Sequence, residues 1–444
     1  MIIRLLPLLL AHLFLFTFQL FAHFQQGLDA YNSRNYSAAL REWKALAMEG
    51  FSPAQYFLGF HYHFALGVPR DNIEALKWYM LAAQKGFAAA QFGLAELYFN
   101  TRKDTIPEAL KWYRLAAQQG FVSAQFKLGV VYQNRISDRD KQEAIKWFEL
   151  AANNGDPYAQ NNLGFMYMNG MGVVKDYSEA MKWYTTSALQ GDSLAQFNLG
   201  LMYRKGEGTQ KDNVRAAKWY TAAAVQGLSS AQNNLGVMYY QGSGVPQDNS
   251  EAIKWFRIAV IKNDPFGQYN LGAMYEKGKG VVQDKREAVK WYTRASVPGD
   301  KEVDLIRGKI YEYEEGYIHS EQDPFGWYTL GFGEEKNQFN LAEMYNKGIG
   351  VSVDKFEAIK WYIRSAKQGF SMAQVALGFI YATGDGVPAD FLYAHMWLNI
   401  AASQGNKYAK EGKEIVETKM TTSEIVNAQQ MATECVSSSY ANCE

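Results

Sequence analysis

One pattern of apolar and polar positions recurs along the chain every 34 to 36 residues, most clearly over residues 159–191. In its first half, Ala159, Leu163 and Tyr167 are four residues apart, a spacing that places them along one face of an α-helix. Two glycines then interrupt the helical pattern and supply the backbone freedom that a tight turn needs. Each copy is therefore predicted to begin with one amphipathic helix and a turn.

The second half of each copy predicts another helix, which begins at an acidic cap. Asp176 can accept a hydrogen bond from a backbone N–H while Glu179, three residues on, reaches back to complete a capping box. Glu179 can also pair with Lys182 on the exposed face of the helix. The cap recurs as Asp71 with Glu74, Asp248 with Glu251, Asp284 with Glu287 and Asp354 with Glu357.

Tryptophan marks every copy. The eleven tryptophans lie at positions 43, 78, 112, 147, 183, 219, 255, 291, 327, 361 and 397, so none is left over for a separate site. Trp183 lies between Ala180 and Ala188, and we expect each such indole to fill the space between helices. Because a helix pair cannot bury its apolar face alone, the copies must stack on one another. The predicted fold is all-α, a solenoid of about eleven helix-turn-helix repeats.

The combined motif resembles the Sel-one-like repeat, a family of the tetratricopeptide superfamily. Its residues are Ala-Gln, Leu-Gly, Tyr, Gly-x-Gly, Asp, Glu-Ala, Lys-Trp-Tyr and Ala-Ala, as read over 54–86 and 231–255. The resemblance covers about residues 25–405 and implies a right-handed superhelix that serves as a scaffold or adaptor. It also implies protein partners, which for secreted bacterial members include host proteins.

The pattern divides the chain into segments. We assign repeats 1–8 to 24–296, a degenerate repeat or hinge to 297–336, repeats 10–11 to 337–405, and a capping helix with a tail to 406–444. In 297–336 the expected Ala-Gln-x-x-Leu-Gly is missing and an acidic aromatic tract takes its place. That segment is either a decayed repeat or a hinge or docking insertion.

The C-terminal segment predicts a helix over 421–433 that caps the array. Thr422 or Ser423 can serve as its N-cap. Ile425, Ala428 and Met431 would then face the last repeat, and the polar remainder would face solvent, as the end of a solenoid requires.

The N-terminus predicts a signal peptide over 1–22, with one positive charge at Arg4 followed by a mostly apolar stretch. An uncleaved membrane anchor is the alternative, because Leu20 fits the cleavage pattern poorly and about 18 apolar residues can nearly span a bilayer. We expect a secreted or periplasmic array, or a membrane-anchored one if the leader stays. Outside the cytoplasm, Cys435 and Cys443 can form a disulfide, or they remain two free thiols.

Composition narrows the possible partners. Lys and Arg number 45 and Asp and Glu number 45, so there is no basic excess to attract nucleic acid. A hydrophobic fraction of 48% with 20% charged residues is typical of a globular protein and excludes a multi-span membrane protein. Two cysteines exclude a zinc site of four thiolates. We expect a monomer without metal or cofactor that meets a membrane only through an uncleaved N-terminus.

The chain also lacks a convincing catalytic constellation. His61 and His63 are two residues apart, which on a helix directs them to different faces, and we expect a surface pair without function. Ser352 and Lys355 fit the Ser-x-x-Lys of serine β-lactamases, but neither Ser-Asp-Asn nor Lys-Thr-Gly occurs. We therefore expect no catalytic residue and no enzyme activity.

The positions that vary between copies predict where a partner binds. Asn161, Phe165 and Met168 are spaced i, i+4 and i+7, so they form a second stripe on the first helix. By analogy with tetratricopeptide arrays, we expect this stripe to line a concave groove and to bind an extended peptide or a folded domain through aromatic anchors. The stripe residues are Tyr56, Phe60, His63, Phe92, Glu96, Phe99, Phe126, Gln133, Asn161, Phe165, Met168, Phe197, Leu201, Arg204, Asn233, Val237, Tyr240, Tyr269 and Glu276.

Some stripe residues can instead belong to the core between repeats, especially Phe60, Phe165 and Val237. The outermost positions, which we expect to contact the partner, are His63, Phe99, Arg204 and Tyr240. The function predicted is a non-catalytic secreted or periplasmic scaffold for protein–protein interaction. The alternatives are a membrane-anchored adaptor in an envelope or lumenal quality-control complex, and a cell-wall or β-lactam-binding enzyme.

Overall fold

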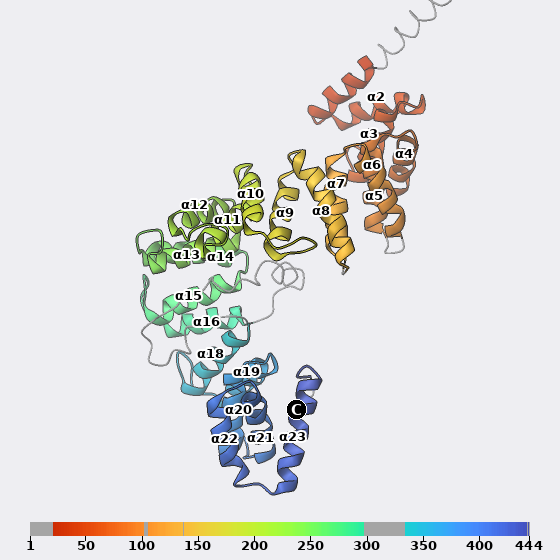
Figure 1. The fold of residues 1–444 in the computed structure, drawn as a ribbon. Coiled ribbons are helices and arrows are strands. Elements are labelled where there is room, and N and C mark those ends of the chain that lie inside the picture. Colours follow the sequence, from red (N-terminus) through yellow and green to blue (C-terminus); the bar gives the residue numbers. More distant parts are fainter. Residues whose placement is uncertain (1–20, 102–104, 136, 297–333, 442, 444) are drawn as a thin grey trace, which may run out of the picture. The chain divides into compact units, whose positions relative to one another are not determined.

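The computed structural model describes residues 21–101, 105–135, 137–296, 334–441 and 443. This part of the chain is helical and contains no strand (Figure 1). It forms two compact units, Met1–Asp192 and Ser193–Glu444. The predicted signal peptide lies almost wholly outside the described residues. None of the described helices has the length and apolar composition that a membrane span requires.

Unit 1 consists of five consecutive helix pairs. In the first pair, a helix over 21–32 precedes α2 (Tyr36–Met48). The other four pairs are α3 (Ser52–Phe64) with α4 (Asn72–Gln84), α5 (Ala88–Thr101) with α6 (Ile106–Gln118), α7 (Val122–Gln133) with α8 (Asp138–Asn153), and α9 (Pro157–Asn169) with α10 (Tyr177–Leu189).

Unit 2 contains five more helix pairs and two terminal helices. The pairs are α11 (Ser193–Lys205) with α12 (Asn213–Val225), α13 (Ser229–Gln241) with α14 (Asn249–Ile261), α15 (Pro265–Lys277) with α16 (Lys285–Ala295), α18 (Glu334–Lys347) with α19 (Lys355–Lys367), and α20 (Ser371–Thr383) with α21 (Phe391–Ser403). The terminal helices are α22 (Lys407–Glu417) and α23 (Thr422–Ser437). The prediction of an all-α solenoid of helix-turn-helix repeats is confirmed.

Most second helices begin at an aspartate cap, including the five that the sequence predicts, but these five are not full capping boxes. The Asp176 carboxylate accepts from the backbone N–H groups of Ser178 and Glu179 at 2.8 and 3.0 Å. The Glu179 carboxylate instead forms an exposed ion pair with Lys182, whose Nζ lies 3.2 Å away. Of the described helices, α23 has both halves of a capping box, with Thr421 rather than Thr422 or Ser423 as N-cap.

The residue after the tryptophan, rather than the tryptophan itself, fills the centre of most repeats. We call this residue the core aromatic. Tyr184 is fully buried whereas Trp183 is only half-buried. The ring of Tyr184 occupies the space that Gly164 leaves open, since a Cβ atom on Gly164 would lie 2.7 Å from its Cδ1. The same contact joins Gly59 to Tyr79, Gly129 to Phe148, Gly200 to Tyr220 and Gly236 to Phe256.

The expectation that each tryptophan fills the space between helices holds fully for Trp43, Trp112, Trp361 and Trp397, which are buried, whereas the other described tryptophans are half-buried. Trp43 is a special case, because it stands four residues after Ala39 just as Tyr184 stands four after Ala180. It therefore occupies the core-aromatic position of the first pair, and a Cβ atom on Gly27 would overlap its indole.

Buried glutamines join each repeat to the next; we call them the glutamine ladder. Gln160 Nε2 donates to the carbonyl oxygen of Ala152 in the preceding helix at 3.0 Å. Its Oε1 in turn accepts from Gln190 Nε2 at 2.7 Å. The first of these bonds recurs at Gln55, Gln91, Gln125, Gln232 and Gln374. The glutamine of the Ala-Gln pair thus satisfies a buried carbonyl group of the preceding helix in these six repeats.

The stack passes directly from α16 to α18. Gly350, in the turn after α18, packs so closely on the start of α16 that a Cβ atom there would overlap the carbonyl oxygen of Lys285. The preceding pair of repeats has the same contact, since a Cβ atom on Gly280 would lie 2.7 Å from the carbonyl oxygen of Asn249. Asn340 Nδ2 also donates to Tyr269 OH at 3.2 Å. The pair α18–α19 therefore occupies the place of the repeat after α15–α16, which leaves no place between them for a repeat made of 297–336.

The region 297–333 itself lies outside the described residues, and so does Trp327. In sequence, residues 323–331 (DPFGWYTLG) match residues 264–272 (DPFGQYNLG), which lead into α15. In this sequence match Trp327 aligns with Gln268.

Two helices, rather than the one predicted, close the C-terminal end. On α23, Ala428 is buried and Met431 packs against the core, as its pattern predicts. Before it, α22 begins at Asn406, whose side chain accepts from Ala409 N, and Gly412 of α22 lies close to Leu398. A disulfide joins Cys435 and Cys443.

Candidate functional site

In unit 1 the predicted stripe lies on the first helices and is mostly half-buried. Phe99 is 36% exposed, and Met168 is the exception, being buried. The remaining stripe residues of this unit are half-buried: Tyr56, Phe60, His63, Phe92, Glu96, Phe126, Gln133, Asn161 and Phe165. Phe60 is half-buried and packs against the hydrophobic core of this unit, and Phe165 is also half-buried.

Two further aromatic residues that the sequence reasoning missed widen this stripe. Phe64 is 54% exposed, and its ring centroid lies 4.6 Å from that of Phe60. Tyr158 is 57% exposed and lies 6.1 Å from Phe126. The signal for Phe64 was its position four residues after Phe60, on the same face of α3. We call Phe60, Phe64, Phe99, Phe126 and Tyr158 the aromatic surface of unit 1.

Glu96 and His63 are the acidic and basic residues of this stripe in unit 1. The Glu96 carboxylate accepts from Tyr113 OH and lies 3.3 Å from Lys127 Nζ. Burial lowers the pKa of His63 below its ordinary value, the nearby Arg70 lowers it further, and Glu96 raises it in part. His63 is therefore neutral at neutral pH. An uncharged, aromatic strip suits apolar side chains of a partner.

In unit 2 most stripe residues are buried. Val237 lies in a core with Phe256 and Leu271, so the core alternative applies to it. The other buried members are Phe197, Leu201, Asn233 and Tyr269. Arg204, Tyr240 and Glu276 are half-buried, and Glu276 accepts from Tyr292 OH at 2.8 Å. Of the four residues predicted to contact the partner, Phe99 is the most exposed, and His63, Arg204 and Tyr240 are half-buried.

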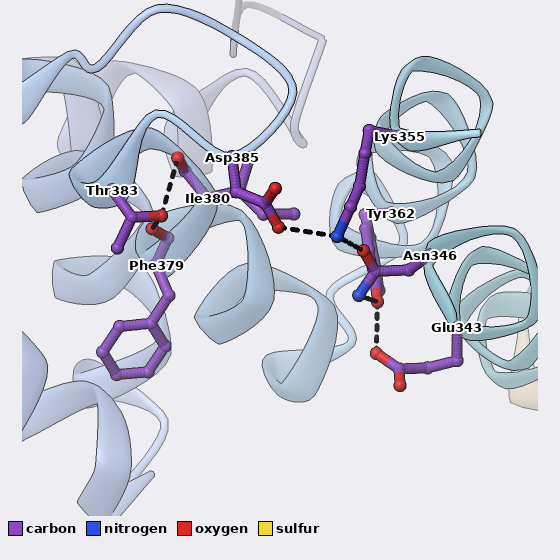
Figure 2. Close-up of polar contacts among 8 residues, drawn as sticks. All are labelled: Glu343, Asn346, Lys355, Tyr362, Phe379, Ile380, Thr383 and Asp385. Atoms are coloured by element: carbon purple, nitrogen blue, oxygen red, sulfur yellow. Dashed lines mark hydrogen bonds and ion pairs between the residues drawn. The ribbon is translucent and has the colours of Figure 1, made fainter. Parts of the chain in front are cut away.

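The stripe continues into α18 and α20, which the prediction did not include. Figure 2 shows these helices with Glu343 and Asn346 on the first and Phe379 on the second. Tyr362 OH donates to the Glu343 carboxylate, which repeats the pairing of Tyr113 with Glu96. Phe379 is exposed, so it extends the aromatic character of the stripe into this unit.

The lysine of the Ser-x-x-Lys match has a structural role. Lys355 Nζ donates to Asn346 Oδ1 at 2.7 Å and lies 2.8 Å from Asp385 Oδ2, in the turn of the following repeat (Figure 2). It therefore joins two repeats. Ser352 lies exposed in the turn before α19.

The predicted histidine pair is not a surface pair. His61 is fully buried, its Nδ1 donates to the carbonyl oxygen of Leu66 at 2.7 Å, and its ring contacts Tyr31 and Trp43. The expectation was wrong for His61 because its position on α3 faces the preceding helix pair. In the part of the chain that the structure describes, no group of three or more His, Cys, Asp or Glu could hold a metal ion.

Comparison with known proteins agrees with the repeat geometry. The sequence model of the Sel1 repeat matches nine segments, at 52–87, 88–121, 122–156, 157–192, 193–228, 229–264, 265–296, 338–370 and 371–406. The chain belongs to the Sel1 repeat family. Sel1 repeats typically mediate protein–protein interactions, and Sel1 repeat proteins are generally non-catalytic scaffolds. No curated protein matches this Sel1 repeat protein.

Two solved structures are similar to the Sel1 repeat protein over most of their length. One is a protective antigen of uropathogenic Escherichia coli strains with an SLR fold, 32% identical, covering 95% of this chain and 93% of that one, with a TM-score of 0.58. The other is a Sel1 repeat protein from Oxalobacter formigenes, 31% identical, covering 76% and 89%, with a TM-score of 0.57.

The matched segments and the helix pairs differ at two places. The pair over 21–48 precedes the first matched segment, yet Trp43 packs in it as a core aromatic does. The gap between the segments that end at 296 and begin at 338 coincides with the direct junction of α16 and α18. The Sel1 repeat protein therefore has ten helix pairs in its described part.

Proposed function

We propose that this Sel1 repeat protein is a non-catalytic scaffold that binds an extended segment of a partner protein along the aromatic surface of unit 1. The observation that carries this proposal is the exposure of Phe64, Phe99 and Tyr158 on or beside the stripe of first helices. Aromatic side chains that are exposed in the free protein and buried in a complex commonly supply most of the affinity. The paired Glu96 and Lys127 leave little charge to repel an apolar segment.

The proposal is tested by affinity capture with the array, residues 24–444, against envelope extract and host secretions, read by mass spectrometry. The groove variant replaces Phe64, Phe99 and Tyr158 by alanine. The matched control replaces Leu81, Leu115 and Leu150, which are also exposed but lie on second helices. We expect a partner that the native array and the control retain and the groove variant loses, with its Kd raised more than about 30-fold. Equal retention by all three arrays would contradict the proposal.

We also propose that the array acts outside the cytoplasm as a secreted or periplasmic monomer. The apolar leader over 1–22 and the Cys435–Cys443 disulfide support this location. The similar Escherichia coli protein is a protective antigen. Cell fractionation with N-terminal sequencing tests the location, and light scattering tests the monomer. A chain that keeps residues 1–22 in the membrane fraction would instead support the membrane-anchored adaptor.

A further inference from the structure

The last residues of the chain fold back as a closed loop against the end of the array. The disulfide joins Cys435, in the last turns of α23, to Cys443, eight residues on. Both cysteines are buried, and they belong to the same hydrophobic core as Met396 and Trp397 of α21. The loop is therefore part of the packed end of unit 2.

Tyr440 of this loop contacts the repeats through its hydroxyl group. Its hydroxyl accepts from Gln404 Nε2 at 3.4 Å. Gln404 also donates to Gln374 Oε1 at 3.2 Å, so Tyr440 extends the last rung of the glutamine ladder. The hydroxyl oxygen lies 3.8 Å from where a Cβ atom on Gly369 would be, which places the tyrosine over the turn between α19 and α20.

The backbone of the loop would not adopt this shape readily on its own. Ser439 and Tyr440 are both left-handed, with φ of 53° and 66°. Two consecutive left-handed residues that are not glycine are unfavourable for L-amino acids. A hydrogen bond from Tyr440 N to the carbonyl oxygen of Cys435, at 2.8 Å, and the disulfide hold the loop closed.

We propose that Cys435 and Cys443 form a redox latch that holds Tyr440 over the turns at Gly369 and Gln404 and thereby seals the C-terminal end of the array. A dithiol opens the latch by thiol–disulfide exchange. One of its thiolates attacks a sulfur of the disulfide and breaks the S–S bond, and its second thiolate then resolves the mixed disulfide. The two cysteines gain two electrons and two protons, and the dithiol leaves as a disulfide.

The latch is closed in an oxidising compartment and open in a reducing one. When it opens, the left-handed residues relax, Tyr440 leaves Gln404, and the end of the ladder becomes accessible to water. This inference does not depend on the identity of a binding partner.

Hydrogen exchange of the full chain, with and without dithiothreitol, tests the latch. We expect reduction to accelerate exchange at least tenfold in peptides that cover 366–371 and 401–407, with α11 unchanged as a check on folding. Tyr440→Ala should produce the same acceleration with the disulfide intact. A chain with Cys435→Ala and Cys443→Ala should not respond to dithiothreitol. Reduction that changes only the loop over 435–443, or a Tyr440→Ala chain that exchanges like the native one, would overturn the proposal.

Discussion

The contact between each core aromatic and its glycine can be tested by a double-mutant cycle at Phe256 and Gly236. Phe256 is fully buried, and a Cβ atom on Gly236 would lie 2.6 Å from its Cε1. Phe256→Ala should cost about 3–5 kcal/mol, the range for a large buried aromatic. Trp255→Ala, on the same helix but half-buried, should cost only about 1–2 kcal/mol.

Gly236→Ala has two opposed effects. The alanine gains about 1 kcal/mol in helix propensity, while the overlap with Phe256 costs about 1–3 kcal/mol. Ala95 and Ala342 occupy the matching position in two other repeats and are fully buried there, so we expect a cost in the lower part of that range. Gly236→Ala should thus be neutral to destabilising in the native chain. In the Phe256→Ala chain the overlap is gone, and the same change should stabilise by about 1 kcal/mol.

The assay is hydrogen exchange of peptides over 229–261, because a long array need not unfold in one step and local exchange reports each repeat separately. The free energies of opening in the four chains give the coupling between the two residues. If Trp255→Ala costs as much as Phe256→Ala, or if Gly236→Ala stays destabilising without the Phe256 ring, our assignment of the core position is refuted.

Three other predictions follow from the same structure. Gln160→Ala should lower the free energy of unfolding by about 1–3 kcal/mol, because the carbonyl group of Ala152 stays buried without its donor. Gln190→Ala should lower it by less than about 1 kcal/mol, and hydrogen exchange over 150–190 compares the two variants. A single proteolytic cut within 297–333 should leave two fragments that co-elute in native size exclusion, since α16 and α18 share one core; separation would contradict this. Burial lowers the pKa of His61 and His63 below 6.5, so as pH falls through that value the unfolded chain binds protons that the folded chain excludes, and stability is lost. Phenylalanine at both positions should flatten this loss between about pH 7 and 5 in thermal unfolding.

The periodic pattern was sufficient to predict the helix pairs, their turns and the pairing of Glu179 with Lys182. It was not sufficient to decide which of two adjacent aromatic residues is central, because Trp183 and Tyr184 are both apolar and lie on neighbouring faces of one helix. The decision depends on Gly164 in the partner helix, which is a tertiary relation.

The candidate site was predictable only in part for a similar reason. Variation between copies suggested the stripe, and in unit 1 most of its residues are half-buried, whereas Met168 is buried. The same helical positions are buried at Phe197 and Tyr269 in unit 2, because burial depends on what packs across a helix rather than on its own period. His61 was misplaced by the same limitation, since its helix offered no sign that its face meets Tyr31 and Trp43.

The direct junction of α16 with α18 has a consequence for how the array comes apart. Most successive repeats are connected by about three residues, as between Ile261 and Pro265, whereas about 38 residues separate Ala295 from Glu334. By loop-closure entropy, bringing two elements together across the longer connection costs about 2 kcal/mol more than across the shorter one. Because each repeat contacts only its neighbours, this free-energy cost weakens only the interface between α16 and α18. The repeats before and after it therefore behave as two cooperative blocks, and on heating the first fracture of unit 2 should fall between them.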